Sequence, residues 1–123
     1  MVMHEQLTNE LVEKVKKIHA GGAPKYHEKL QQQNKLFVRD RLALLFDDAQ
    51  YEEDGRFANC SSDEFPADGV VCAIGKIGGR TVCVMANDST VKAGSWGSRT
   101  VEKIIRIQET AEKMCVPILY LVD

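Results

Sequence analysis

The stretch MANDSTVKAGSWG, Met85 to Gly97, decides the fold of this chain. It starts as an apolar, strand-like run, continues as a loop rich in Gly and Ser, and leads to a helix that we expect to begin near Ser98. Ligand sites of α/β proteins lie at such strand-to-helix crossings. The backbone at Gly94 and Gly97 can approach a ligand closely, and the unpaired N–H groups of a helix start favour phosphates and oxyanions. Most turns of this kind bind nothing, so other parts of the sequence must identify the function.

The composition limits the class of protein. The 123 residues are 44% hydrophobic and 28% charged with a formal net charge of −2, which predicts one globular core and no room for two full domains. This charge balance is unlike that of a nucleic-acid-binding domain. No apolar run approaches the roughly 20 residues that cross a bilayer, and the N-terminus lacks the features of a signal peptide. We expect no nucleic-acid or membrane partner and a cytoplasmic protein, or a mitochondrial-matrix protein in a eukaryote, although no transit peptide is visible.

Residues of the usual catalytic and metal-binding types do not form a site in the sequence. The cysteines have no CxxC or similar spacing and three of the four lie in apolar runs, which predicts buried free thiols rather than zinc ligands or disulfides: Cys60, Cys72, Cys83 and Cys115. The histidines all fall in the polar N-terminal region and are expected at the surface: His4, His19 and His27. We therefore assign no catalytic side chain and no metal ligand.

The first third of the chain is expected to be helical. Leu7, Leu11, Val15 and Ile18 share a narrow face of a helix that ends near Ala20, before Gly21-Gly22. This apolar face suits docking on a neighbour, but a terminal helix packed on its own domain explains it equally well. A polar helical segment follows over 24–33.

A second helical segment is expected over Asn34 to Phe46, with Leu42, Leu45 and Phe46 in the core. Lys35, Arg39 and Arg41 lie along it and form either a solvated helix face or an anchor for a phosphorylated ligand. Asp47-Asp48 ends the helix, and the acidic stretch 50–66 is expected to be a surface connection.

The second half has the pattern of a sheet. VVCAIGKI and RTVCVMA flank Gly78-Gly79, which predicts a β-hairpin, and their nearly continuous apolarity predicts cover on both faces. The helix from about Ser98 to Met114 has an apolar half and a charged half, with Ser98 as its N-cap. The apolar half contains Val101, Ile104, Ile105, Ile107, Ala111 and Met114, and the charged half contains Glu102, Lys103, Arg106, Glu109 and Lys113. Pro117 ends the helix before a strand ILYLV, which completes a right-handed βαβ unit.

The carboxyl ends of the two parallel strands, at Asn87-Asp88 and Val122-Asp123, are expected on the same rim of the sheet. The sequence stops there, where a functional loop is expected, and a three-stranded sheet covered on both faces needs more chain. We therefore expect these residues to be part of a longer protein.

Three segments of the chain together carry a family resemblance. KYHEKLQQQNKLFVRDRLALLFDD with the DGVV hairpin, VMANDSTVKAGSWGSRTVEKIIRIQE and PILYLVD resemble the N-terminal part of the carboxyltransferase (beta) subunit of biotin-dependent acyl-CoA carboxylases, such as propionyl-CoA and methylcrotonoyl-CoA carboxylases. The resemblance implies an α/β fold, the first portion of a crotonase-like (ClpP-like) β-β-α superhelix preceded by N-terminal helices. It implies a helical region over 1–48 and the beginning of the crotonase-like domain over 49–123, continuing beyond residue 123.

The chemistry that the resemblance implies is transfer of a carboxyl group from carboxybiotin to the α-carbon of an acyl-CoA. Removal of the α-proton gives an enolate, whose oxygen needs backbone donors. In the family these donors lie in turns that follow a strand like YLVD, so this piece alone is expected to be inactive. The implied partners are acyl-CoA, a biotin carboxylase or biotin carrier subunit that holds the biotin, and further copies in a hexamer.

The family role of the 85–97 loop is to line the acyl-CoA site. The resemblance therefore implies that the backbone of Ala93, Gly94, Ser95 and Gly97 lies near CoA and that Val91 and Trp96 shape the pocket, although Trp96 could equally serve core packing or a subunit contact. It also raises Lys35, Arg39 and Arg41 to candidates for the CoA phosphates.

The loop and the end of the chain bear on the substrate. ANDSTVKAGSWG and YLVD resemble methylcrotonoyl-CoA-type subunits more than propionyl- or acetyl-CoA-type subunits, although Ala93 replaces a more usual Gly. We expect a short or branched acyl-CoA. Two alternatives stay open: a biotin-dependent acyl-CoA decarboxylase subunit, and a non-catalytic CoA-binding or assembly piece. The zinc ribbon of some acetyl-CoA carboxylase beta subunits is excluded because the paired CxxC ligands are absent.

Overall fold

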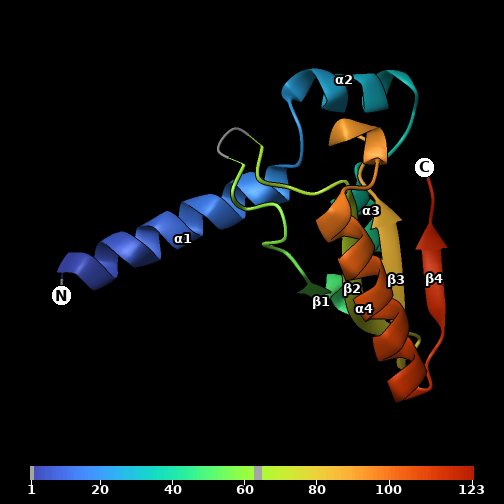
Figure 1. Ribbon diagram of the computed structural model, residues 1–123. Coiled ribbons are helices and arrows are strands. Elements are labelled where there is room, and N and C mark those ends of the chain that lie inside the picture. The colour runs from blue at the N-terminus through green and yellow to red at the C-terminus, as the bar shows by residue number, and fades with distance from the viewer. Residues whose placement is uncertain (1, 63–64) are drawn as a thin grey trace.

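A mixed sheet of four strands, in the order β1-β2-β3-β4, organises the part of the chain that is described, residues 2–62 and 65–123 of a computed structural model. Helix α3 lies on one face of the sheet and α4 on the other, while α1 extends away from it (Figure 1). The elements are α1 Val2–Ala20, α2 Pro24–Gln32, α3 Val38–Leu45, η1 Asp47–Ala49, β1 Tyr51–Asp54, β2 Val70–Ile77, β3 Arg80–Asn87, η2 Lys92–Gly94, α4 Ser98–Met114 and β4 Ile118–Leu121.

The expected hairpin forms the centre of the sheet. β2 and β3 pair antiparallel from Val70↔Asn87 to Ile77↔Arg80. The turn at Gly78 and Gly79 has φ of 59° and 79°, which is the left-handed geometry of a tight hairpin turn. The Asp47 carboxylate accepts hydrogen bonds from both turn N–H groups, at 2.9 and 2.8 Å, and the bonds from Gly79 and then Gly78 lower the pKa of Asp47.

The expected βαβ unit is also confirmed. α4 connects β3 to β4, and these two strands pair in parallel from Cys83↔Ile118 to Ala86↔Leu121. The helix ends at Cys115, which has φ of 54°, and Pro117 precedes β4. Cys72 and Cys83 are buried as expected, whereas Cys60 is half-buried and Cys115, at the left-handed C-cap of the helix, is exposed, so the expectation of buried thiols is wrong for Cys115 and only partly met for Cys60.

The sheet is covered on both faces, as its apolarity predicts. One face packs on α3 through Val38, Leu42, Val71, Ala73, Val84 and Ala86, together with Phe46. The other packs on α4 through Val70, Cys72, Cys83, Met85, Ile104, Ile107 and Ala111. Successive residues of β2 and β3 alternate between these two clusters, as the pleat of a strand requires. The first 48 residues thus contribute α3 to the core of the sheet, and the division at residue 48 remains a prediction.

The stretch expected to be a surface connection contains an additional strand. β1 pairs antiparallel with β2 from Tyr51↔Gly75 to Asp54↔Cys72, so the expectation is wrong for residues 51–54. Three of its four residues are polar, YEED, so a search for apolar runs does not identify this strand. As an edge strand it needs no apolar cover on its outer side.

Three other expectations need correction within the helices. α4 has Gly97 at its N-cap and Ser98 as its first residue. The face of α4 that is buried is narrower than the expected apolar half, since Val101, Ile105 and Met114 are 42 to 47% exposed. Lys103, which was expected on the charged, exposed half, is only 4% exposed. α3 begins at Val38, because Asn34 has a left-handed φ of 56° that interrupts a helix from 34 onward.

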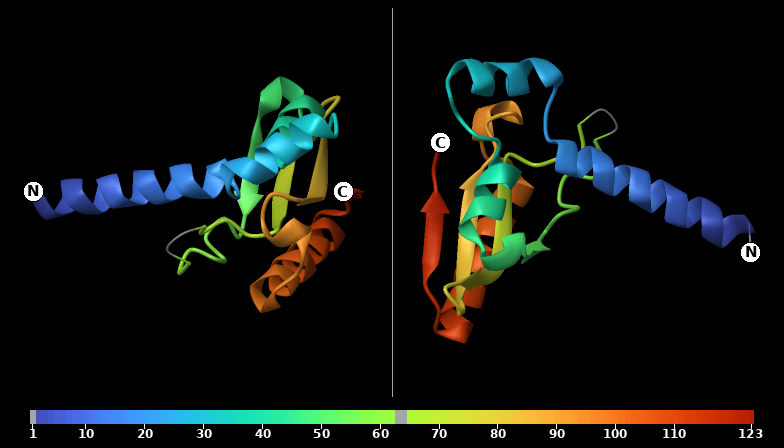
Figure 2. Two further views of the ribbon diagram at one scale, coloured as in Figure 1. Left: turned by 90° about the horizontal axis from the view of Figure 1, so that it is seen from above. Right: turned by 180° about the vertical axis from the view of Figure 1, so that it is seen from behind.

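Helix α1 extends away from the sheet in all three views (Figures 1 and 2). Ile18 is buried near its end, whereas Leu7 and Leu11 are 56% and 54% exposed. The narrow apolar face is therefore uncovered over most of its length, and packing of the whole helix on its own domain is wrong. No helix of the described residues is long and apolar enough to span a membrane.

Candidate functional site

The carboxyl ends of β3 and β4 meet at one end of the molecule, beside η2 and α2 (Figure 1). The Arg41 guanidinium donates from Nη2 to the carbonyl oxygens of Asn87 and Leu121, each at 3.2 Å, and so joins the two strand ends. This confirms the expected common rim. An open depression of about 480 Å³ lies there, lined by Tyr26, Lys29, Leu30, Gln33, Lys35, Ser89, Lys92, Ala93 and Asp123.

Three lysines give the depression its charge. Lys29 comes from α2, Lys35 from the segment that follows α2, and Lys92 from η2. Against these three cations the lining contains one carboxylate, Asp123, whose Oδ1 lies 2.8 Å from Lys35 Nζ. The hydrogen bond from Lys35, followed by one from Ser89, lowers the pKa of Asp123 and keeps it ionised. The depression thus carries excess positive charge, which suits a phosphorylated ligand.

The first anchor of the 88–97 loop is a buried carboxylate. Asp88 is 3% exposed and accepts hydrogen bonds from the backbone N–H of Thr90 at 3.0 Å and from its hydroxyl at 2.5 Å. Burial raises the pKa of Asp88, and the bonds from Thr90 oppose that rise. Thr90 Oγ1 in turn accepts from Gly22 N–H at 3.0 Å, and a Cβ on Gly22 would lie 1.7 Å from the Thr90 carbonyl oxygen. The glycine pair after α1 therefore serves close packing against the loop as well as helix termination.

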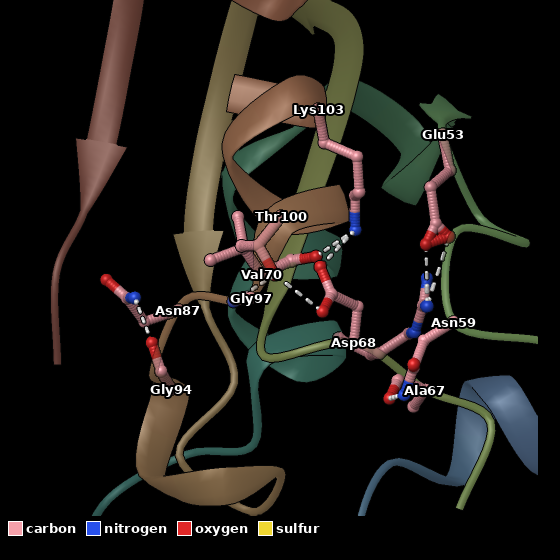
Figure 3. Close-up of polar contacts among 11 residues, drawn as sticks. Glu53, Asn59, Ala67, Asp68, Val70, Asn87, Gly94, Gly97, Thr100 and Lys103 are labelled. Atoms are coloured by element: carbon pink, nitrogen blue, oxygen red, sulfur yellow. Dashed lines mark hydrogen bonds and ion pairs between the residues drawn. The ribbon is translucent and has the colours of Figure 1, made fainter. Parts of the chain in front are cut away.

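The second anchor is within the loop. Asn87 Nδ2 donates to the carbonyl oxygen of Gly94 at 3.2 Å (Figure 3). Three successive residues, Lys92, Ala93 and Gly94, have left-handed φ of 46°, 55° and 73°. Such a conformation costs an L-residue about 1–2 kcal/mol, and strained backbone of this kind concentrates at ligand sites. The left-handed conformation of Ala93 also explains why Gly is the natural alternative at this position.

The third anchor fixes the end of the loop at the start of α4. The N–H of Gly97 donates to Thr100 Oγ1 at 3.0 Å, and that hydroxyl donates to Asp68 Oδ1 at 2.7 Å. Lys103 Nζ lies 3.1 Å from the other oxygen, Asp68 Oδ2, and donates to the Val70 carbonyl (Figure 3). The Lys103 and Asp68 side chains are only 5% and 13% exposed.

The three basic candidates of the sequence do not form a cluster. Arg39 is turned toward β1, where Nη2 lies 2.7 and 3.1 Å from the two carboxylate oxygens of Glu53, a side chain only 2% exposed. Arg41 binds the carbonyls of the strand ends. Of the three, only Lys35 lines the depression. Arg39 and Arg41 are two residues apart on α3 and therefore point to different sides of it, while Lys35 precedes the helix, and a count of charges along the sequence does not resolve this.

The loop candidates lie at the rim in different environments. Gly94 and Val91 are buried, whereas the remaining loop residues singled out in the sequence, Ala93, Ser95, Trp96 and Gly97, are exposed. Trp96 is 58% exposed, so it serves no core packing in the described residues, and a pocket or subunit contact remains for it. The sequence analysis missed Lys29, Ser89 and Lys92 as lining residues, although Ser89 and Lys92 both lie within the quoted stretch 85–97.

The residues that line the depression include no histidine or cysteine. Among residues 2–62 and 65–123 no group of three or more His, Cys, Asp or Glu side chains could hold a metal ion. His19 is exposed, as expected. Partial desolvation of its ring, and to a smaller extent the positive charge of Arg39, lower the pKa of His19. His27 is half-buried rather than at the surface: its Nε2 lies 2.8 Å from the Ala20 carbonyl oxygen and its ring packs on Phe37.

Residues 29–123 match the sequence model of the carboxyl transferase domain family. An uncharacterized carboxylase, YngE, of Bacillus subtilis strain 168 is 67% identical over 93% of this chain and 22% of its own length. The methylmalonyl-CoA decarboxylase subunit alpha of Veillonella parvula is 41% identical over 92% of this chain and 24% of its own. The mitochondrial methylcrotonoyl-CoA carboxylase beta chain of Dictyostelium discoideum is 36% identical over 93% and 20%.

A solved structure of transcarboxylase 12S, described as a hexamer with methylmalonyl-coenzyme A bound, has the same fold. Its TM-score is 0.85 at 33% identity, over 94% of this chain and 24% of that one. This likeness confirms the fold class expected from the sequence, crotonase-like with preceding helices. The chain spans about a fifth to a quarter of the length of the relatives it matches.

Proposed function

This chain belongs to the carboxyl transferase domain family, and from that membership we propose that it forms the N-terminal, acyl-CoA-binding part of a biotin-dependent carboxyltransferase. The reaction is transfer of a carboxyl group from carboxybiotin to the α-carbon of a short or branched acyl-CoA such as propionyl-CoA, or to the γ-carbon of an α,β-unsaturated one such as methylcrotonoyl-CoA, whose enolate charge extends to that carbon. The observation that carries the proposal is the lysine-lined depression beside the strained loop, at the carboxyl ends of two parallel strands.

In this proposal Lys29, Lys35 and Lys92 bind the phosphates of CoA. Their ammonium groups are flexible point charges, which suit phosphates that are held at a partly open surface. The backbone from Ala93 to Gly97, which is exposed except at Gly94, forms with Trp96 the wall along which the pantetheine arm and thioester lie. Arg39 and Arg41 hold the scaffold instead, because Nη2 of Arg39 binds the Glu53 carboxylate and Nη2 of Arg41 binds the strand-end carbonyls.

The reaction breaks the C–H bond at the acceptor carbon of the acyl-CoA and the N–C bond of carboxybiotin, and forms one C–C bond and the N–H bond of free biotin. Biotin, held by a biotin carrier partner, supplies the carboxyl group and accepts the proton from the acceptor carbon. No side chain among the described residues of this chain is assigned a proton or a covalent bond in the reaction. Their contribution is to hold the CoA thioester at a fixed place and orientation, which can lower a bimolecular barrier substantially.

The assembly and the compartment are parts of the same proposal. We place the chain in a homo-hexamer that works with a biotin carboxylase and carrier subunit, supported by the likeness to transcarboxylase 12S, which is described as a hexamer. The reaction would take place in the cytoplasm, or in the mitochondrial matrix of a eukaryote. The division into a helical region, 1–48, and the start of a crotonase-like domain, 49–123, belongs to the proposal as well.

A second candidate is the reverse reaction, in which a carboxyl group leaves an acyl-CoA. The relative from Veillonella parvula, a methylmalonyl-CoA decarboxylase subunit alpha, supports it at 41% identity. The same phosphate-binding lysines would serve either direction, so geometry at this rim does not choose between them. A non-catalytic CoA-binding role is the third candidate.

A carboxyl-transfer assay of the full-length protein tests the proposal. The protein would be incubated with free biotin or its biotinylated partner and with propionyl-, methylcrotonoyl-, acetyl- and methylmalonyl-CoA, and both carboxylated and decarboxylated products would be measured. Carboxylation of a short or branched acyl-CoA supports the main proposal, and loss of carboxyl from methylmalonyl-CoA alone supports the second. Tight CoA binding without transfer in either direction would leave the non-catalytic role.

A further inference from the structure

The contact between Asp68 and Lys103 is an ion pair withdrawn from solvent at the start of α4, and stability alone explains it poorly. Desolvation of two charges offsets most of their attraction, and apolar residues of similar size often serve stability equally well. The aliphatic stem of Lys103 is also confined, since a Cβ on Gly55 would lie 2.7 Å from Lys103 Cγ.

The hydrogen bonds around this pair have a fixed direction. Asp68, as a carboxylate, can only accept, so the single proton of the Thr100 hydroxyl points to Asp68 Oδ1 at 2.7 Å. The Thr100 oxygen is then left as an acceptor for Gly97 N–H at 3.0 Å. Lys103, donating to Asp68 Oδ2 and to the Val70 carbonyl, holds that carboxylate in place. Each bond polarises the next, so the series orients the peptide group at Gly97.

We infer that Asp68, Thr100 and Lys103 are positioning residues that fix the end of the acyl-CoA loop at Gly97. The inference rests on the proposed function, because that proposal places the CoA thioester along this backbone. Gly97 is the residue at which the exposed loop enters a helix that is packed on the sheet. An anchor at this point limits the freedom of residues 95–97, whose backbone receives no other side-chain hydrogen bond from the part of the chain that the structure describes.

The test removes the Thr100 hydroxyl without changing the shape of the side chain. In the full-length enzyme, Thr100→Val breaks the bond to Gly97 and keeps the ion pair, whereas Thr100→Ser keeps the hydroxyl. Thr110→Val is the matched control, because Thr110 Oγ1 bonds only to the Arg106 carbonyl of the same helix. A lost hydrogen bond of ordinary strength predicts that Thr100→Val raises KM for the acyl-CoA up to about tenfold, with KM for the biotin substrate unchanged.

Amide hydrogen exchange of the Gly97 N–H provides a measurement that does not depend on activity. We expect faster exchange in Thr100→Val and in Asp68→Asn, whose amide can donate to the hydroxyl and reverse the direction of the series. Wild-type exchange and wild-type acyl-CoA KM in Thr100→Val would overturn the inference, and so would a failure of Thr100→Ser to restore them. If the wild-type enzyme transfers no carboxyl group, the proposed function fails, whereas the exchange measurement still decides whether the anchor exists.

Discussion

Replacing Gly94 with Ala perturbs the loop at the residue where its backbone is most constrained. Gly94 has φ of +73°, and an added Cβ would lie 3.3 Å from Asn87 Cβ and 3.4 Å from Asn87 Nδ2. The left-handed conformation costs an Ala about 1 kcal/mol. Displacement of Asn87 also weakens its 3.2 Å bond to the Gly94 carbonyl, a loss of about 1 kcal/mol.

A total of about 2 kcal/mol against the native loop lowers the population that is competent to bind, so acyl-CoA affinity should fall by up to about 30-fold. Isothermal titration of the full-length protein with acyl-CoA measures this change. Gly79→Ala is the matched control: Gly79 has φ of +79°, nothing lies within 4 Å of the added Cβ, and the residue is in the hairpin turn at the other end of the sheet (Figure 1). We expect this control to lose stability and to keep its CoA affinity. Wild-type CoA affinity in Gly94→Ala would refute the reasoning.

Three further predictions concern charges and thiols. Lys29→Ala and Lys92→Ala should each weaken binding of acyl-CoA by roughly two- to fivefold but leave binding of acyl-pantetheine, which lacks the nucleotide phosphates, unaffected. Equal losses of affinity for both ligands would contradict phosphate binding. Lys16→Ala on α1 is the control. Arg39→Ala should lower the free energy of unfolding by about 3 kcal/mol, because Glu53 at 2% exposure loses its main partner. Arg106→Ala breaks an ion pair in which Arg106 is 67% exposed, so it should leave the free energy of unfolding nearly unchanged, and equal unfolding curves for the two variants would disprove the distinction. Burial raises the pKa of Cys72 to about 12, so at pH 8 mass-mapped alkylation should modify the exposed Cys115 and spare Cys72 until the protein unfolds.

The hairpin and the βαβ unit could be predicted because each has a local signal. Gly78-Gly79 between two apolar runs specifies a turn, and the periodicity of residues 98–114 specifies a helix that connects parallel strands. β1 could not be predicted in this way, because YEED gains its strand conformation from pairing with β2 rather than from its own side chains.

The rim could be predicted, and most of its side-chain chemistry could not. Strand polarity alone places Asn87 and Val122 at one end of the sheet. Arg39 binds Glu53 away from the depression, whereas Lys29, Lys35 and Lys92 all line it. This arrangement depends on how α2 and α3 are oriented in space, which cannot be read from the spacing of residues in the sequence. Burial of Lys103 depends on Asp68, 35 residues away, and had no local signal.

A crystal structure of the full-length protein with an acyl-CoA bound would locate the binding site. We expect the CoA phosphates beside Lys29, Lys35 and Lys92, and the pantetheine arm along the backbone of residues 93–97. Acyl-CoA bound elsewhere, with the depression at the carboxyl ends of β3 and β4 free of it, would show that this rim is not the acyl-CoA site.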